Sequence, residues 1–152
     1  MSSIYNSCVA FHKAPFGAVR AGQAVTFTLR VPAEFGCTAP RLVLHRDGKA
    51  PAPFVLHSAG GADGRDLFTI TLPMPQPGLY FYYFDLYTGY RKLYRGALGE
   101  AYVTTGTGEE YQLTVYEAGF ATPQAIKGGV MYQIFPDRFF EGRPKPMPFA
   151  DR

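Results

Sequence analysis

The sequence contains no tryptophan and only two cysteines, Cys8 and Cys37. Neither cysteine has the spacing of a metal ligand or of a redox motif. The two side chains either form a disulfide or stay as buried free thiols, and we expect free thiols because an unpaired cysteine packs like a small hydrophobic residue. The three histidines, His12, His45 and His57, are too scattered along the chain to indicate a metal site.

Long apolar runs are also absent. No segment approaches the roughly 20 apolar residues that a membrane-spanning helix needs, and the N-terminus has no basic segment followed by an apolar one. We therefore expect a cytoplasmic protein with no membrane partner. Charged residues make up only 18% of the chain and the net charge is +3. The basic residues form no run beside stacking aromatic residues, so we expect no nucleic-acid partner.

What the sequence does contain indicates an all-β body. It has 13 Phe and 11 Tyr, which favour strands, together with 17 Gly and 13 Pro, which favour turns. Apolar and polar residues alternate, or nearly so, in several short segments, and about seven strands are predicted at the even spacing of a β-sandwich. The clearest of them cover residues 24–31, 40–46, 54–57, 68–72, 79–87 and 111–116, and the glycine-rich residues 59–65 are expected to form a loop.

The segment from Gly78 to Tyr87 is the most strongly predicted strand. By the period of two, Tyr80, Tyr82, Phe84 and Leu86 share one face and Phe81, Tyr83 and Tyr87 share the other. Gly78 followed by Tyr80 at the start of a late strand resembles the tyrosine corner of immunoglobulin-like sandwiches, in which the phenol caps the preceding connection. The expected fold is therefore an all-β, immunoglobulin-like β-sandwich.

The composition changes after residue 118. Residues 119–128 contain few large apolar side chains and are expected to form a linker. The run from Val130 to Phe135 follows, and its nearly continuous hydrophobicity is typical of a strand buried on both faces of a parallel sheet. We therefore predict a sandwich over residues 1–118 and the incomplete start of a second domain over residues 129–152.

The stretch from Gly128 to Phe139 resembles the first barrel strand of glycoside hydrolase family 13, the α-amylase family, and in particular neopullulanases and cyclomaltodextrinases. Residues 112–116, with Thr122-Pro123 beyond them, and residues 77–84 resemble the end of the N-terminal module of such enzymes and its tyrosine-rich strand. The resemblance implies an accessory module followed by a truncated (β/α)8 barrel, in a parent enzyme that cleaves α-glucans with retention. The module is expected to help shape the substrate groove, to dimerise or to bind glucan weakly. A complete barrel needs about 250 residues, more than the 152 residues of this chain.

The resemblance places the catalytic carboxylates on later barrel strands, so no catalytic residue is predicted in this chain. Asp137 beside Arg138 is interpreted as a structural ion pair, since no second carboxylate has a matching spacing. Some members of the family bind calcium through an Asp-Gly-Asn sequence at this point. Here the corresponding residues are 141–143, Glu-Gly-Arg, and the arginine disfavours a calcium ion. We expect no metal and no other cofactor.

Four aromatic residues, Phe81, Tyr83, Tyr87 and Tyr90, are the candidate substrate-binding residues. Phe81, Tyr83 and Tyr87 form an outward row, and Tyr90 is expected on the following strand together with Tyr94. Flat aromatic faces suit the apolar faces of glucose rings. The alternative, which the absence of tryptophan favours, is that this face packs against the enzyme's own catalytic barrel or a partner subunit in a homodimer. The resemblance predicts contact with an α-glucan or maltooligosaccharide through the parent enzyme. The competing hypothesis is a free-standing immunoglobulin-like carbohydrate-binding or interaction module without an enzymatic parent.

Overall fold

The computed structural model describes residues 3–135 and divides the chain into two compact units, Met1–Phe120 and Ala121–Arg152. Within the described residues the first unit is built from strands and the short 3-10 turn η1 (Ala33–Phe35), and the second carries the 3-10 turn η2 (Gln124–Ile126). None of the described segments forms a helix that is long and apolar enough to cross a membrane. The all-β prediction is confirmed.

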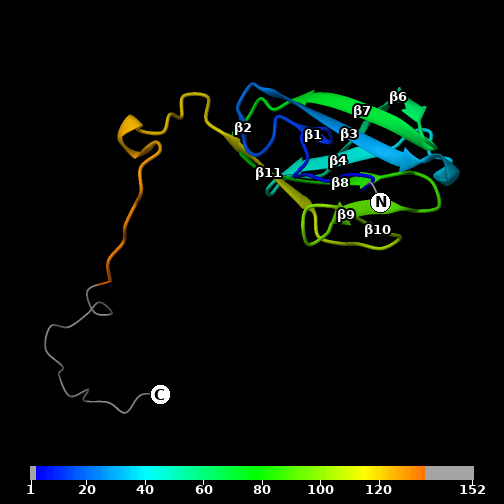
Figure 1. Cartoon of the computed structure of the whole chain (residues 1–152). Helices are drawn as coiled ribbons and strands as arrows, with labels where there is room; N and C mark the ends of the chain where they lie inside the picture. The colour runs from blue at the N-terminus through cyan, green and yellow to red at the C-terminus, as the bar shows by residue number, and fades with distance from the viewer. Residues whose placement is uncertain (1–2, 136–152) are drawn as a thin grey trace, which may run out of the picture. The chain divides into compact units, whose positions relative to one another are not determined.

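The smaller sheet has four antiparallel strands in the order β1-β3-β7-β6. Its centre is the pair β3–β7, in which nine residues of each strand are in register, with Phe27 opposite Ile70. Figure 1 shows β3 and β7 side by side, with β6 next to β7. The strands are β1 (Lys13–Ala14), β3 (Ala24–Pro32), β6 (His57–Ala62) and β7 (Arg65–Pro73).

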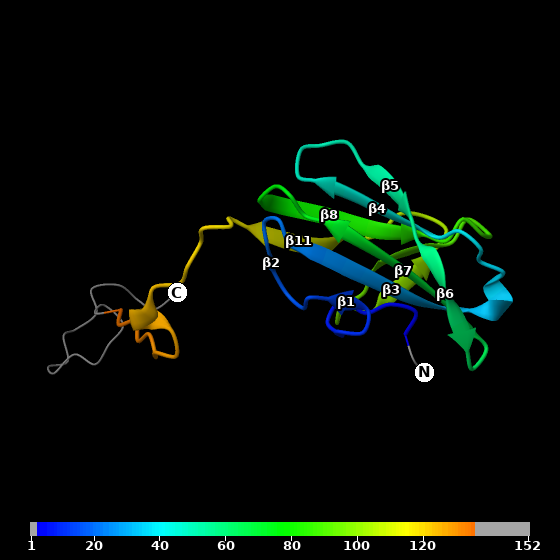
Figure 2. The same ribbon diagram turned by 90° about the horizontal axis from the view of Figure 1, so that it is seen from above.

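The larger sheet has seven strands and is organised around β8. On one side β8 pairs with β4, which pairs with β5; on the other it pairs with β11 over residues 78–82 and with β9 over residues 84–85. Figure 2 shows β4, β5 and β8 in one layer and β3 and β7 in the other. The strands are β2 (Val19–Arg20), β4 (Arg41–Arg46), β5 (Ala52–Val55), β8 (Gly78–Asp85), β9 (Lys92–Arg95), β10 (Ala101–Thr104) and β11 (Tyr111–Tyr116).

The core lies between the two sheets and follows the predicted alternation. Val25, Phe27, Leu29 and Val31 of β3 are completely buried. Opposite them, the predicted inner face is buried as well, at Tyr80, Tyr82 and Phe84 of β8 and at Leu86 directly after it. Burying one large apolar side chain stabilises the fold by roughly 1.5–3 kcal/mol, so this alternation fixes which face of each strand points inward.

The predicted tyrosine cap is present. The Tyr80 hydroxyl donates a 2.9 Å hydrogen bond to the carbonyl oxygen of Gln76, in the connection that precedes β8. The two-sheet architecture agrees with the predicted sandwich. Its immunoglobulin-like identity stays a prediction, because a tyrosine cap is one local feature and does not define a topology.

The glycine-rich residues 59–65, predicted as a loop, are instead mostly strand. β6 extends through Ala62, and the turn to β7 consists of Asp63 and Gly64, both with positive φ of 54° and 69°. Such a two-residue turn is typical of a tight hairpin. All six residues of β6 are exposed, so no apolar alternation marks this edge strand in the sequence. The short strands β1, β2 and β10 were not predicted either, because segments of two to four residues are too short to show a clear alternation. The described residues form eleven strands rather than about seven.

The cysteines are both free thiols. Cys37 is buried, as expected, and its thiol donates to the carbonyl oxygen of Leu86 at 3.1 Å. Cys8 is exposed, contrary to the expectation that both would be buried. It follows Asn6, whose side-chain oxygen accepts a 2.8 Å hydrogen bond from the Cys8 amide, in a surface turn that directs the thiol away from the core.

The second unit is described as far as Phe135. The predicted barrel strand from Val130 to Phe135 has no strand hydrogen bonding in this chain, and Val130 and Met131 are 95% and 85% exposed. A parallel barrel strand obtains its hydrogen bonds from neighbouring strands on both sides, and the chain supplies none to this segment among residues 3–135. The calcium-motif residues 141–143 and the pair Asp137-Arg138 lie outside the described residues.

Candidate functional site

The outer face of β8 carries the predicted aromatic row. Phe81, Tyr83 and Asp85 alternate with the buried residues of β8 and therefore point away from the core. All three are partly exposed. Neighbouring strands cover the rest of their surface, so the contacts they make decide how much of each ring a ligand can reach.

Tyr83 is engaged by residues of β9. Its ring stacks on the Tyr94 ring, with centroids 4.8 Å apart and planes inclined by 18°, and the Lys92 ammonium lies 5.8 Å from its centroid. Burial raises the pKa of the Tyr83 phenol, and the carboxylates of Asp85 and Glu110 act in the same direction. The phenol is therefore neutral at physiological pH and can both donate and accept hydrogen bonds. Its ring contacts Tyr94 and Lys92 of the same domain.

Phe81 is engaged by the neighbouring strand β4. The His45 ring lies over Phe81 with centroids 5.7 Å apart, and His45 is held there by a 2.8 Å hydrogen bond from its Nε2 to the Glu110 carboxylate. This contact joins β4 to the segment that leads into β11. It leaves part of the Phe81 ring open to solvent.

Tyr87 and Tyr90 differ from the first two residues. They lie in the turn between β8 and β9, and their side chains are 62% and 86% exposed. Both have a φ of +56°. This left-handed conformation costs a residue with a side chain roughly 1–2 kcal/mol. Two bulky residues in it, both exposed, are the kind of backbone outlier that clusters at functional sites.

Several contacts hold this turn in place. The amide of Leu86 donates to the carbonyl oxygen of Arg91 at 3.0 Å, closing the turn. The Thr88 hydroxyl donates to the carbonyl oxygen of Phe35 at 3.0 Å, and the Arg91 guanidinium lies 4.6 Å from the centre of the Phe35 ring. The turn is therefore tied to η1, and its exposed tyrosines are presented in a defined position.

Tyr87 has two further contacts of its own. Its amide donates to the Asp85 carboxylate at 2.8 Å, and the Arg41 guanidinium lies 3.9 Å from the centre of its ring. One approach to the Tyr87 ring is thus occupied by a cation. No cation–π contact is found for the Tyr90 ring among residues 3–135, which makes Tyr90 the more accessible stacking surface.

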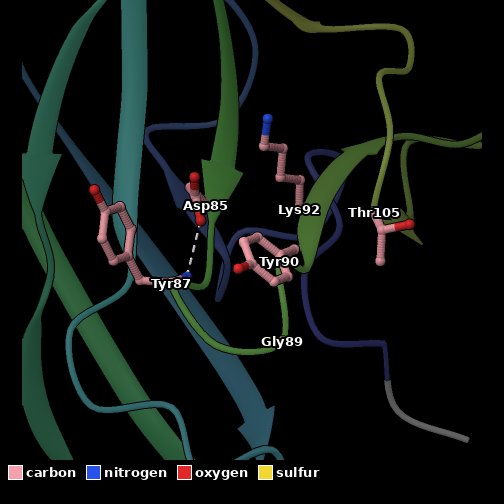
Figure 3. A pocket seen from close by; sticks show the side chains of 6 residues that line it. All are labelled: Asp85, Tyr87, Gly89, Tyr90, Lys92 and Thr105. Carbon is pink, nitrogen blue, oxygen red and sulfur yellow. Dashed lines mark hydrogen bonds between the residues drawn. The ribbon is translucent and has the colours of Figure 1, made fainter.

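A hollow of about 640 Å³ opens beside these tyrosines. Figure 3 shows the Asp85 side chain between Tyr87 and Tyr90, the Lys92 side chain above the Tyr90 ring, and Thr105 on the far side of Tyr90. The hollow places the two tyrosine rings beside a carboxylate, an ammonium and a hydroxyl group. We call it the Tyr90 hollow, and it is lined by Asp85, Tyr87, Gly89, Tyr90, Lys92 and Thr105.

The four predicted residues therefore divide into two pairs. Tyr87 and Tyr90 line the Tyr90 hollow, whereas Phe81 and Tyr83 pack against His45, Tyr94 and Lys92 on the sheet. Tyr90 lies in the turn and not on the strand that carries Tyr94. Asp85, Lys92 and Thr105 were not predicted as site residues from the sequence. Thr105 follows β10 and reaches the hollow only through the fold, so no local pattern could have revealed it.

Nothing in the described part of the chain groups three or more His, Cys, Asp or Glu side chains in a way that could hold a metal ion. The outer face offers hydrogen-bonding groups and aromatic surface. Aromatic surface with a few polar groups beside it is the usual lining of a small-molecule site.

Comparison with known proteins finds amylopullulanases as relatives, and no protein-family model matches the chain. The amylopullulanase of Thermoanaerobacterium saccharolyticum is 34% identical over 154 aligned positions, covering 87% of this chain and 11% of that protein. The amylopullulanases of Thermoanaerobacter thermohydrosulfuricus and Thermoanaerobacterium thermosulfurigenes are 35% and 36% identical and cover 87% and 88% of this chain.

The chain spans only about a tenth of the length of these relatives. Over most of its own length it is nevertheless homologous to a segment of each. The similarity supports the relation to the α-amylase family that the sequence indicated, and it relates this chain to one segment of the amylopullulanases.

Proposed function

We propose that this chain is an accessory β-domain of an α-glucan-acting glycoside hydrolase of the α-amylase family. The observation that carries the proposal is the similarity to amylopullulanases over 87–88% of the chain. The catalytic carboxylates belong to the rest of the parent enzyme, which we propose retains the anomeric configuration. Residues 129–139 would form the first strand of the catalytic barrel of this enzyme. We propose that the enzyme is cytoplasmic.

The contribution that we propose for the domain is weak binding of maltooligosaccharides in the Tyr90 hollow. Three features support it: an exposed tyrosine ring, a backbone held in a strained conformation, and polar groups of both signs around the ring. Tyr90 would stack on the apolar face of a glucose ring. Asp85, Lys92 and Thr105 would exchange hydrogen bonds with its hydroxyl groups, since a carboxylate accepts, an ammonium donates and a hydroxyl does both.

Titration of the chain with maltotriose, followed by calorimetry, tests this proposal. We expect a dissociation constant weaker than about 10 μM. Tyr90→Ala should weaken binding about tenfold or more, because aromatic contacts of this kind contribute roughly 1 kcal/mol beyond the area they bury. The matched control is Tyr102→Ala on β10, which removes another exposed tyrosine that does not line the hollow. Absence of binding, or equal effects of both substitutions, would refute the binding role.

The second candidate role is packing of this face against the catalytic barrel or against a second copy of the protein. The observation that favours it is the partial burial of Phe81 and Tyr83, which leaves less ring surface for a sugar. In that case Tyr90→Ala would change the oligomeric state or thermal stability of the full-length enzyme. It would leave maltotriose binding by the domain unaffected. A free-standing carbohydrate-binding or interaction module would bind sugar by itself but would occur without any hydrolase attached.

A further inference from the structure

A second hollow lies beside the outer face of β8. Its volume is about 380 Å³. Phe81, which lines it, is four residues before Asp85, which lines the Tyr90 hollow, and both side chains point to the same face of β8. Four residues of strand correspond to about 13 Å. We call this second site the Gln112 hollow, and it is lined by Ser7, Phe81, Arg95, Glu109, Glu110 and Gln112.

The charges in the Gln112 hollow are paired, so it is not a simple acidic cluster. Glu109 accepts a 2.7 Å hydrogen bond from the Arg95 guanidinium, and Glu110 accepts a 2.8 Å hydrogen bond from His45. Each carboxylate keeps lone pairs that can accept from hydroxyl groups. Paired charges favour an uncharged ligand over a cation.

Gln112 adds hydrogen-bond donors to the carboxylate acceptors of this hollow. It lies opposite Phe81 in the β8–β11 register and its side chain is exposed. Its amide offers two donors and one acceptor oxygen beside the open part of the Phe81 ring. Both hollows therefore place an aromatic ring beside hydrogen-bonding side chains: Phe81 beside Gln112 here, and Tyr90 beside polar residues in the Tyr90 hollow.

The surface between the two hollows includes the partly exposed ring of Tyr83. Tyr83 lies between Phe81 and Asp85 on the same face of β8, and its ring is stacked on Tyr94. From these three observations we infer that one α-glucan chain binds along β8. One end of the bound segment occupies the Tyr90 hollow, the middle crosses the exposed part of the Tyr83 ring, and the other end lies over Phe81 and beside Gln112. This inference rests on the proposed binding role and adds a second contact site to it.

The test compares a short and a long ligand on four proteins. Maltotriose and maltoheptaose are titrated into the unmodified chain, Gln112→Ala, Thr114→Ala and Tyr90→Ala. Thr114 is the matched control because it is exposed and lies two residues after Gln112 on β11, outside the Gln112 hollow. Equal melting temperatures and circular dichroism spectra establish that the variants are folded.

We expect Gln112→Ala to weaken maltoheptaose binding about fivefold, which corresponds to the loss of one neutral hydrogen bond. It should leave maltotriose binding unchanged. Thr114→Ala should affect neither sugar, and Tyr90→Ala should weaken both. The decisive result is that Gln112→Ala weakens the binding of maltoheptaose but not of maltotriose. Tighter binding of maltoheptaose by the unmodified chain would not be enough, because a longer sugar offers more overlapping trisaccharides to a single site.

Unchanged maltoheptaose binding by Gln112→Ala, with maltotriose binding still dependent on Tyr90, would refute the extended site and leave the proposed function standing. An equal loss from Thr114→Ala would also refute it, since the effect would then not be specific to the Gln112 hollow. Failure of every protein to bind either sugar would refute the proposed binding role itself.

Discussion

The hydroxyl group of Tyr80 and the carbonyl oxygen of Gln76 are joined by a 2.9 Å hydrogen bond across the turn that leads into β8. The Tyr80 ring is 9% exposed and belongs to the core between the sheets. The Tyr80 side chain therefore packs in the core with its ring and holds the connection before β8 with its hydroxyl group. β8 is the strand on which the candidate site is built, so the position of the site depends on this anchor.

Removing the hydroxyl while keeping the ring tests this anchor. Tyr80→Phe should lower the free energy of unfolding by about 1 kcal/mol, the usual contribution of one intramolecular hydrogen bond. Tyr102→Phe is the control because Tyr102 is 56% exposed on β10. Urea unfolding at equilibrium measures both. Equal stability of the two variants would show that the bond to Gln76 contributes nothing.

The hydroxyl groups of Tyr5 and Tyr82 are hydrogen-bonded to each other at 2.8 Å, and both residues are completely buried. Tyr5→Phe leaves the Tyr82 hydroxyl without this partner, and we expect a loss of about 1–3 kcal/mol in the free energy of unfolding. The double variant, with both residues changed to Phe, should lose less than the sum of the single variants, because no buried hydroxyl is then left unpaired. Strictly additive losses would contradict a direct coupling between the two groups.

His12 predicts a pH dependence of stability. It is 5% exposed, and its Nδ1 is 2.8 Å from the carbonyl oxygen of Thr28. Burial lowers the pKa of His12, with the hydrogen bond to Thr28 acting in the opposite direction. Below the ordinary pKa of about 6.5 the unfolded chain binds more protons than the folded one, so this contribution to stability is complete above that pH and is lost as the pH falls.

Unfolding free energies measured at about pH 7.5 and about pH 5 test this sign. His12→Gln should reduce the difference between the two values, whereas His57→Gln, which changes an exposed residue of β6, should preserve it. A pH dependence that is the same in the unmodified protein and in both variants would assign the effect to other groups.

The two thiols should differ in reactivity. Burial raises the pKa of Cys37 to about 11, so at about pH 8 this thiol is protonated and a poor nucleophile. Cys8 is exposed. Iodoacetamide should therefore modify one cysteine in the folded chain and both in denaturant, and Cys8→Ser should abolish labelling of the folded form. Rapid labelling of both thiols without denaturant would show that the Cys37 environment opens readily.

Binary patterning determined the framework of this protein. The alternation in residues 24–31 and 79–87 fixed two central strands and the side chains they bury, because one buried face is required of any strand in a two-sheet fold. The Gly-x-Tyr sequence at residues 78–80 identified the tyrosine cap, because the cap depends on local geometry. The edge strands β6 and β10 escaped detection, because strands without a buried face carry no such pattern.

The exposure of the aromatic residues in the candidate site could not be predicted from the sequence. Phe81, Tyr83, Tyr87 and Tyr90 form one aromatic group in the sequence, and they separate because β9 and β4 supply Tyr94, Lys92 and His45 to the first two. Lys92 and Tyr94 come from β9, the next strand along the chain, and His45 comes from β4, which is far from β8 in sequence. Both strands lie beside β8 only in the folded chain. The sequence thus determined which residues are aromatic and that Phe81 and Tyr83 share one face of β8. Tertiary packing alone decided which rings stay exposed, because a ring's exposure depends on its neighbours across the sheet and not on its own position along the chain.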